Sequence, residues 1–332
     1  MTTETGGELL ADRYDLWVDL YKAGAVADVT LEKYRMTGVW LRELAKELTA
    51  HELDRPRYQG ILNEYAKTHE KATTLDFHRQ VRCFVKDLIH DGEIEKDPTY
   101  KAIVKGAMPT KKKKPKFLHE EELRRLSLSI QLDERPEPGS HDDGPNVDWL
   151  LLVLAKTGVR YAEALGLTPE DFDFRAKTVS INKTWHYKLK EITGFAKTKN
   201  LASVRTISID GQLAESFGNR IANLPRSEPI FVRKNEAGGY IRVFNSTINA
   251  ALAARCRHAN VPVIAVHALR HTHASVLLSA GVSIHSISRR LGHSNVGTTQ
   301  NVYAHILHGL NQKDSLLIAD TLSTLTKVGA TC

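Results

Sequence analysis

Apolar residues recur every three or four positions through the first hundred residues, which is the spacing of amphipathic helices. The pattern predicts helices over residues 16–24, 31–49, 55–69 and 75–92. Helices of this length gain little stability alone and must bury their apolar stripes against one another. We therefore expect four or five short helices to form a compact bundle over residues 10–105.

The chain after residue 117 predicts mostly helix. Residues 149–158 are almost continuously apolar, which favours a buried helix, with a buried strand as the alternative. The other segments with helical spacing are residues 118–129, 245–260, 267–281 and 283–293.

Strands are expected in one part of this second region. Two short segments rich in β-branched residues, 178–188 and 203–210, read as strands, with a hairpin connection over residues 190–202. The predicted fold class is therefore multi-domain, α and α+β. It combines an N-terminal helical bundle with a mainly helical second domain that holds a small antiparallel β-sheet.

A run of lysines separates the two regions. It is either a solvated linker or a strap along DNA phosphates. The chain has 46 Lys and Arg against 39 Asp and Glu, a net charge of +7, which points to a polyanionic partner and favours the strap. The lysines are Lys111, Lys112, Lys113, Lys114 and Lys116. The predicted division is a helical domain at residues 1–107, a basic linker at 108–117 and a second domain at 118–332.

Composition excludes several classes of protein. Hydrophobic residues make up 42% and charged residues 26% of the chain, which excludes a wholly disordered protein. No apolar run approaches the roughly 18 residues of a membrane-spanning helix. Cys83, Cys256 and Cys332 lie far apart, so neither a disulfide framework nor a zinc ribbon is expected. The polar, acidic N-terminus differs from a signal peptide. We therefore expect a soluble, cytoplasmic protein.

Six residues with chemically useful side chains stand out together. Each alone has an ordinary explanation: Arg160, for example, could simply pair with Glu163 one helical turn on. As a set, they supply the cations that neutralise a pentavalent phosphorane and a hydroxyl that can attack phosphorus. The six are Arg160, Lys197, His267, Arg270, His293 and Tyr303.

The order and context of these residues resemble the tyrosine recombinase (phage integrase) family. The resemblance is carried by TGVRYAEALGL, AKTKNLASVRTI, HALRHTHAS, LGHS and NVYAH, and it extends over residues 10–320. It implies that the N-terminal bundle is a core-binding domain that clamps DNA, and that the second domain is catalytic and ends in a tail helix. Nothing before residue 10 supplies the arm-binding domain of many integrases, so the chain either lacks one or starts after it.

The resemblance also implies a role for each residue. Tyr303 would attack the scissile phosphate, form a 3′-phosphotyrosyl link and release a 5′-hydroxyl. Arg160 and Arg270 would bind the non-bridging oxygens with a bidentate geometry that lysine lacks. His293 would donate a further hydrogen bond there. His267 would assist proton transfer at the tyrosine hydroxyl.

The remaining roles are supporting ones. Lys197 would protonate the leaving 5′-oxygen, although Lys199, two residues away on the same hairpin, is an alternative. Glu163 would orient an arginine or a histidine. His271 is expected to be a supporting or packing residue. The histidines at 267, 271 and 273 invite a metal site, but there is no HExxH motif and no carboxylate or cysteine nearby, so we expect no metal and no cofactor.

The implied partners are double-stranded DNA recombination sites. Arg242, Arg255 and Arg257 lie on or beside the helix predicted at 245–260 and either enter a groove or merely solvate the helix. The tail beyond Tyr303 carries an apolar stripe that packs on its own domain or on a neighbouring protomer. The resemblance implies a homo-tetramer on DNA, a monomer or weak oligomer when free, accessory DNA-bending proteins and no membrane partner.

Three functions are compatible with these residues. The favoured one is a site-specific DNA recombinase that integrates, excises or inverts DNA, as mobile elements require. A type IB topoisomerase would use the same chemistry to relax DNA without exchanging partners. A DNA-binding regulator could keep the fold without the reaction, although the complete set of reactive residues argues against it.

Overall fold

The computed structural model divides into two compact units, Met1–Lys112 and Lys113–Cys332. The residues it describes are 8–107, 115, 117–130, 132, 146–187, 194–303 and 318–323. The five lysines of the predicted linker lie outside these ranges. Within the described part, no helix is both long and apolar enough to cross a membrane.

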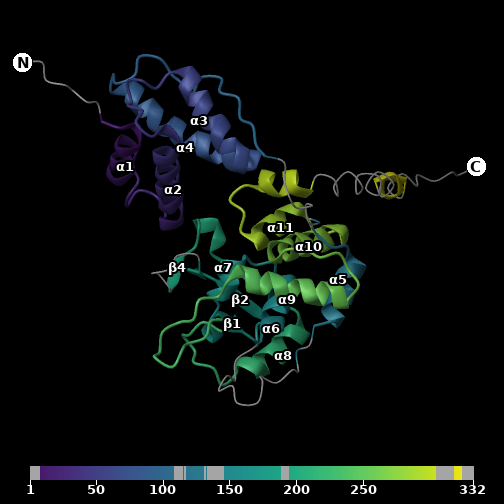
Figure 1. Cartoon of the computed structure of the whole chain (residues 1–332). Coiled ribbons are helices and arrows are strands. Elements are labelled where there is room, and N and C mark those ends of the chain that lie inside the picture. Colours follow the sequence, from purple (N-terminus) through teal and green to yellow (C-terminus); the bar gives the residue numbers. More distant parts are fainter. Residues whose placement is uncertain are drawn as a thin grey trace, which may run out of the picture. The chain divides into compact units, whose positions relative to one another are not determined.

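The first unit is a bundle of α-helices (Figure 1). They are α1 (Leu10–Tyr21), α2 (Asp28–Ala45), α3 (Arg55–Thr68) and α4 (Lys71–His90). Their core contains a cluster of aromatic rings: the Phe84 ring lies 5.2 Å from Tyr14 and 5.5 Å from Trp17. The predicted bundle is confirmed. Helix α1 begins six residues before the predicted start, because Leu10 and Tyr14 extend its buried stripe towards the N-terminus.

The second unit is mainly helical. Its helices are α5 (Glu120–Leu128), α6 (Val147–Thr157), α7 (Tyr161–Leu165), α8 (Gly211–Ile221), α9 (Asn245–His258), α10 (Val266–Ser279) and α11 (Ile284–Leu291). Helix α6 confirms the helical interpretation of residues 149–158. Its continuous apolar run fits its position, because nearly every side chain of α6 is buried. Helix α10 packs against it.

Helix α8 was not predicted from the sequence. Two glycines, Gly211 and Gly218, weaken its helical propensity. Tertiary contacts offset this cost, since Leu213 and Phe217 are buried and the Asp210 side chain caps the first turn by accepting from the Leu213 N–H at 2.9 Å.

The strands form two small antiparallel sheets. β1 (Phe172–Asp173), β2 (Thr178–Ile181) and β5 (Arg205–Ser208) make one, in the order β1-β2-β5, and β3 (Lys183–Trp185) pairs with β4 (Phe195–Lys197) in the other. The predicted hairpin connection over residues 190–202 contains a further strand, Phe195–Lys197, that the sequence did not indicate. The Phe195 ring packs edge-on against Trp185 at 5.1 Å and holds this short pairing. The predicted fold class is confirmed.

Candidate active site

Arg270 lies at the centre of the site and is 4% exposed. Its Nη1 donates to the carbonyl oxygen of Gly158 at 2.8 Å, and its Nη2 donates to that of Leu291 at 2.6 Å. These carbonyls lie at the C-terminal ends of α6 and α11, where backbone oxygens lack partners within the helix. Main-chain acceptors therefore fix the guanidinium before any ligand arrives.

Two glycines make this arrangement possible. Gly158 and Gly292 both have φ of 68°, in the left-handed region that favours glycine. A Cβ at Gly158 would lie 2.6 Å from the His273 ring, and one at Gly292 would lie 2.9 Å from the carbonyl oxygen of Ala202. The turn at Gly292 also directs its carbonyl oxygen to Arg160 Nη2, 3.0 Å away. The glycines of the TGVR and LGH motifs are thus explained by the acceptors they present.

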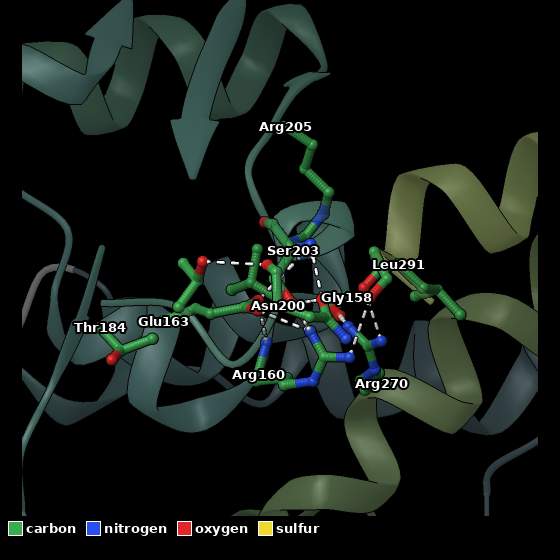
Figure 2. A network of polar contacts seen from close by, with 12 residues as sticks. Gly158, Arg160, Glu163, Thr184, Asn200, Ser203, Arg205, Arg270 and Leu291 are labelled. Carbon is green, nitrogen blue, oxygen red and sulfur yellow. Dashed lines mark hydrogen bonds and ion pairs between the residues drawn. The ribbon is translucent and has the colours of Figure 1, made fainter. Parts of the chain in front are cut away.

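The carboxylate of Glu163 lies between two arginines (Figure 2). Its Oε1 accepts from Arg160 Nη1 at 2.7 Å, and its Oε2 accepts from the Arg160 backbone N–H at 2.8 Å and from Arg205 Nη2 at 2.9 Å. Arg160 Nη1 also donates to Ser203 Oγ at 3.3 Å. The contact between Arg160 and Glu163 that the sequence spacing suggests is therefore present.

Glu163 is ionised in this environment although it is only 1% exposed. Burial alone would raise the pKa of Glu163. The hydrogen bond and charge of Arg205, followed by those of Arg160, outweigh burial, so the pKa lies below its ordinary value. The carboxylate therefore serves as a fixed anion between the two guanidinium groups.

Tyr303 is 2% exposed and packs in a small apolar cluster with Leu278, Ile287 and Leu291. Its hydroxyl lies 3.0 Å from Nδ1 of His271. Burial, opposed by the charge of Arg270, raises the pKa of Tyr303 to about 12. In this conformation the hydroxyl is protonated at neutral pH and enclosed.

His271, rather than His267, contacts the tyrosine hydroxyl. Both lie on α10, and the His267 ring packs edge-on against His271 at 5.0 Å. Desolvation, followed by the charges of Arg270 and Arg160, lowers the pKa of His267. The predicted role of His267 in proton transfer stays a prediction. His271, predicted from the sequence to be a supporting or packing residue, lies closer to the tyrosine hydroxyl than expected.

His293 faces the same cations. Burial, followed by the charges of Arg270, Arg160 and Arg205, lowers the pKa of His293 to about 4, so the ring is neutral at pH 7. Its Nδ1 lies 2.7 Å from the hydroxyl of Thr299. When that hydroxyl donates to Nδ1, the ring proton sits on Nε2, which suits His293 as a hydrogen-bond donor.

The predicted lysines and DNA-contacting arginines lie outside this network. Lys197 is exposed at the end of β4, and Lys199 is exposed two residues on. Arg255 forms an ion pair with the buried Asp148 at 2.6 Å, which gives it a structural role in α9. Arg242 donates to a backbone carbonyl at 3.1 Å, and Arg257 is exposed. Their contacts with DNA stay predictions.

Sequence reasoning missed Arg205, which lies in the SVRTI segment. It is an arginine in a strand whose neighbours along the chain are apolar or β-branched, and a charge there signals a buried partner. It also missed Thr299 and the pair formed by His273 and Arg290. The Nε of Arg290 donates to Nε2 of His273 at 2.9 Å, and Nδ1 of His273 faces a carbonyl oxygen of α6 at 2.9 Å.

His273 makes stability depend on pH. Burial, followed by the charge of Arg290, lowers the pKa of His273 to about 4. Between its ordinary pKa of about 6.5 and this value, the unfolded chain binds the proton and the folded one does not, so stability falls as pH falls. We expect the free energy of unfolding of wild type to drop by about 2 kcal/mol more between pH 7 and pH 5 than that of His273→Asn. Urea titrations at both pH values measure this.

The matched control is the exposed His285 on α11. His285→Asn should keep the wild-type difference between pH 7 and pH 5. An equally steep loss of stability in His273→Asn would show that His273 is not the residue responsible.

Comparison with known families identifies this chain. Residues 116–309 match the model of the phage integrase family, which covers more than half of the sequence, and the chain belongs to that family. A XerC-like tyrosine recombinase of Caldanaerobacter subterraneus subsp. tengcongensis is 27% identical over 275 residues, 76% of this chain and 66% of that protein. Tyrosine recombinase XerD of Brucella suis biovar 1 is 28% identical over 303 residues, 85% of this chain and 88% of that protein.

One phage relative matches a shorter part of the chain. An integrase of a Staphylococcus phage is 31% identical over 175 residues, about half of each chain.

Among solved structures, a Tn1549 transposon integrase in complex with transposon right end DNA has a TM-score of 0.72 at 18% identity and covers 94% of this chain and all of that one. XerH site-specific recombinase bound to difH substrate has a TM-score of 0.59 at 17% identity, covering 91% of this chain and 83% of that one. At these identities the structures show a shared fold.

Proposed function

We propose that this protein is a site-specific DNA recombinase that cleaves and rejoins DNA through a 3′-phosphotyrosyl intermediate and exchanges strands between two sites. The observation that carries the proposal is the convergence of Arg160 and Arg270 on carbonyls at the end of α11, in the same small region as His293 and the buried Tyr303. Cations held by main-chain acceptors are preorganised to stabilise a pentavalent phosphorus.

The reaction follows from these groups. The Tyr303 oxygen attacks the phosphorus, and the bond between phosphorus and the 5′-oxygen breaks while the new P–O bond forms. The tyrosine proton leaves through a neighbouring base, for which His271 at 3.0 Å and His267 are the candidates. Lys197, with Lys199 as the alternative, gives the 5′-oxygen a proton. Attack by a 5′-hydroxyl reverses the step, so rejoining requires no nucleotide cofactor.

Negative charge on the phosphate is the main barrier to attack, and the arginines address it. A guanidinium can bind two oxygens in one plane, which matches the non-bridging oxygens of a phosphodiester. His293, neutral at pH 7, would donate a further hydrogen bond without adding charge. We propose no metal in this mechanism, because these side chains supply the charge stabilisation that a metal supplies elsewhere.

The partners follow from the same proposal. Relatives with this fold have been solved with transposon end DNA and with difH DNA, which supports double-stranded recombination sites as the substrate. We propose that the first unit is the core-binding domain, that the lysines of the linker contact phosphates, and that the protein acts as a tetramer on paired sites. In the described part of the tail, Ile318 and Leu322 are more than half exposed, which suits docking on another protomer.

A covalent-capture selection tests the chemistry. The full-length protein is incubated with nicked duplexes of random sequence. DNA that stays attached to the protein in SDS is then released with protease, recovered and sequenced. Cleavage beside the nick frees a short strand that diffuses away, so the adduct accumulates. We expect enrichment of one sequence and a nucleotide attached to Tyr303 through a 3′-phosphate.

Three outcomes contradict the proposal. An adduct on another residue overturns the assigned nucleophile. Specific binding of one sequence without any adduct identifies a non-catalytic regulator. Relaxation of a supercoiled plasmid that carries two copies of the selected site, with no new junction between them, identifies a topoisomerase-like enzyme instead.

A further inference from the structure

Arg205 on β5 is as tightly held as the arginines of the predicted site. Its side chain is 6% exposed. Its Nη2 donates to Glu163 Oε2 at 2.9 Å, its Nη1 to the carbonyl oxygen of Ser203 at 2.7 Å, and its Nε to that of Arg290 at 2.6 Å. Figure 2 shows Arg205 extending from the strand towards Ser203, beside the carboxylate that also holds Arg160. Every nitrogen of this guanidinium therefore has an acceptor, so the side chain is oriented inward.

The charges of this network explain why a third arginine is needed. Glu163 paired with Arg160 alone would cancel the positive charge that a phosphate requires. Because Glu163 is 1% exposed, solvent would screen that cancellation only weakly. Arg205 supplies a second positive charge to the same carboxylate, so the three side chains together carry one net positive charge.

Arg205 also fixes the end of α11. The carbonyl oxygen of Arg290 accepts from Arg205, and the next two carbonyls of the chain accept from Arg270 and Arg160. One side chain thus connects the acceptors of both predicted phosphate-binding arginines with the carboxylate that orients one of them. Movement of Arg205 would therefore displace two acceptors of Arg160, the carboxylate of Glu163 and the carbonyl oxygen of Gly292.

We propose that Arg205 is a positioning residue for phosphodiester cleavage. Through Glu163 and the end of α11, it holds the Arg160 guanidinium against a non-bridging oxygen of the scissile phosphate and keeps its charge available. This inference rests on the proposed function and assigns Arg205 no contact with DNA. Loss of Arg205 therefore weakens stabilisation of the transition state and leaves DNA affinity near the wild-type value.

The test compares two substrates of the captured sequence, one with a normal scissile phosphate and one with a methylphosphonate. The methylphosphonate lacks the negative charge that Arg160 would neutralise. In single-turnover reactions, we expect Arg205→Gln to slow adduct formation about 100-fold on the phosphate. On the diastereomer whose methyl group replaces the oxygen facing Arg160, the loss should stay below about tenfold, so the ratio of the two rates falls at least about tenfold.

Arg290→Lys is the matched control. Arg290 is a partly buried arginine of α11, but its guanidinium contacts His273, Ser208 and backbone carbonyls and not Glu163. Its replacement should lower the midpoint of thermal unfolding and keep the wild-type ratio of phosphate to methylphosphonate rates. Arg205→Lys, which keeps the charge and loses the three-way geometry, gives a smaller fall in the ratio than Arg205→Gln, and it tests the proposal if the glutamine variant does not fold.

The possible failures are separable. No adduct with wild type on the normal phosphate overturns the proposed function itself. Adduct formation by wild type, with both Arg205 variants slowed equally on the two substrates, overturns the positioning role. The positioning role is also overturned if the Arg205 variants bind DNA more weakly but the bound complex forms the adduct at the wild-type rate.

Discussion

Replacing Tyr303 by phenylalanine should abolish covalent adduct formation and leave DNA binding intact. The substitution removes only the hydroxyl group, whose oxygen is the proposed nucleophile. Because the side chain is 2% exposed, the substitution changes almost no surface that DNA could contact. We expect no SDS-stable adduct with the selected nicked duplex, and a dissociation constant within about twofold of wild type in an electrophoretic mobility-shift titration. The lost hydrogen bond to His271 should cost about 1 kcal/mol of folding free energy.

Tyr161 provides the matched control for this variant. It is 8% exposed, follows Arg160 directly, and its hydroxyl has no hydrogen-bond partner in the described part of the chain. Tyr161→Phe should form the adduct at the wild-type rate. Residual adduct with Tyr303→Phe would mean that another residue attacks the phosphorus.

The fold could be predicted where a pattern is local. The N-terminal helices follow from the spacing of apolar residues, and α6 follows from a continuous apolar run that favours a buried helix. The glycines with left-handed backbone conformation, Gly158 and Gly292, fall in turns that the sequence marks. Strand β4 was not predicted, because three residues carry too little periodicity and its pairing depends on Trp185, ten residues earlier. Helix α8 was not predicted, because its glycines argue against a helix locally and the contacts that stabilise it are distant in sequence.

Only those site residues that lie in recognisable sequence motifs could be predicted from the sequence. Arg160 with Glu163 is a local pair, three residues apart, and the sequence gives it directly. The acceptors of Arg270 are backbone carbonyls, one of them 112 residues away, and backbone groups leave no mark in a sequence. Arg205 on β5 contacts Glu163 on α7, 42 residues earlier in the chain, and no local sequence pattern indicates a contact over that separation.

The two histidines of α10 illustrate a further limit. His267 and His271 are one turn apart, so both share a helix face and spacing cannot decide which of them reaches Tyr303. The choice is made by the position of residues 296–303, whose helix follows the turn at Gly292. In the structure His271 contacts the Tyr303 hydroxyl, whereas the sequence motif predicted only a supporting role for it.

Replacing Glu163 by glutamine should destabilise the second unit strongly. The substitution keeps the shape of the side chain and removes the charge that balances Arg160 and Arg205, both of which remain in place. Arg205 is 6% exposed and Arg160 is 27% exposed. Leaving a buried cation such as Arg205 without its counter-ion typically costs about 3–5 kcal/mol. Hydrogen exchange of peptides from residues 146–187, measured through a urea titration at pH 7.5, reports this unit separately from the first.

The pH dependence of this effect follows from the lowered pKa of Glu163. A carboxyl whose pKa is lowered by folding contributes stability above its unfolded pKa, about 4.3, and loses that contribution as pH falls through the folded value. The difference in stability between wild type and Glu163→Gln should therefore be constant at neutral pH and shrink below about pH 4. Glu228→Gln is the control, because Glu228 pairs with Lys234 at the surface, each 38% exposed, and should change stability by no more than about 0.5 kcal/mol. A Glu163→Gln protein as stable as this control would show that the carboxylate does not hold the two arginines together.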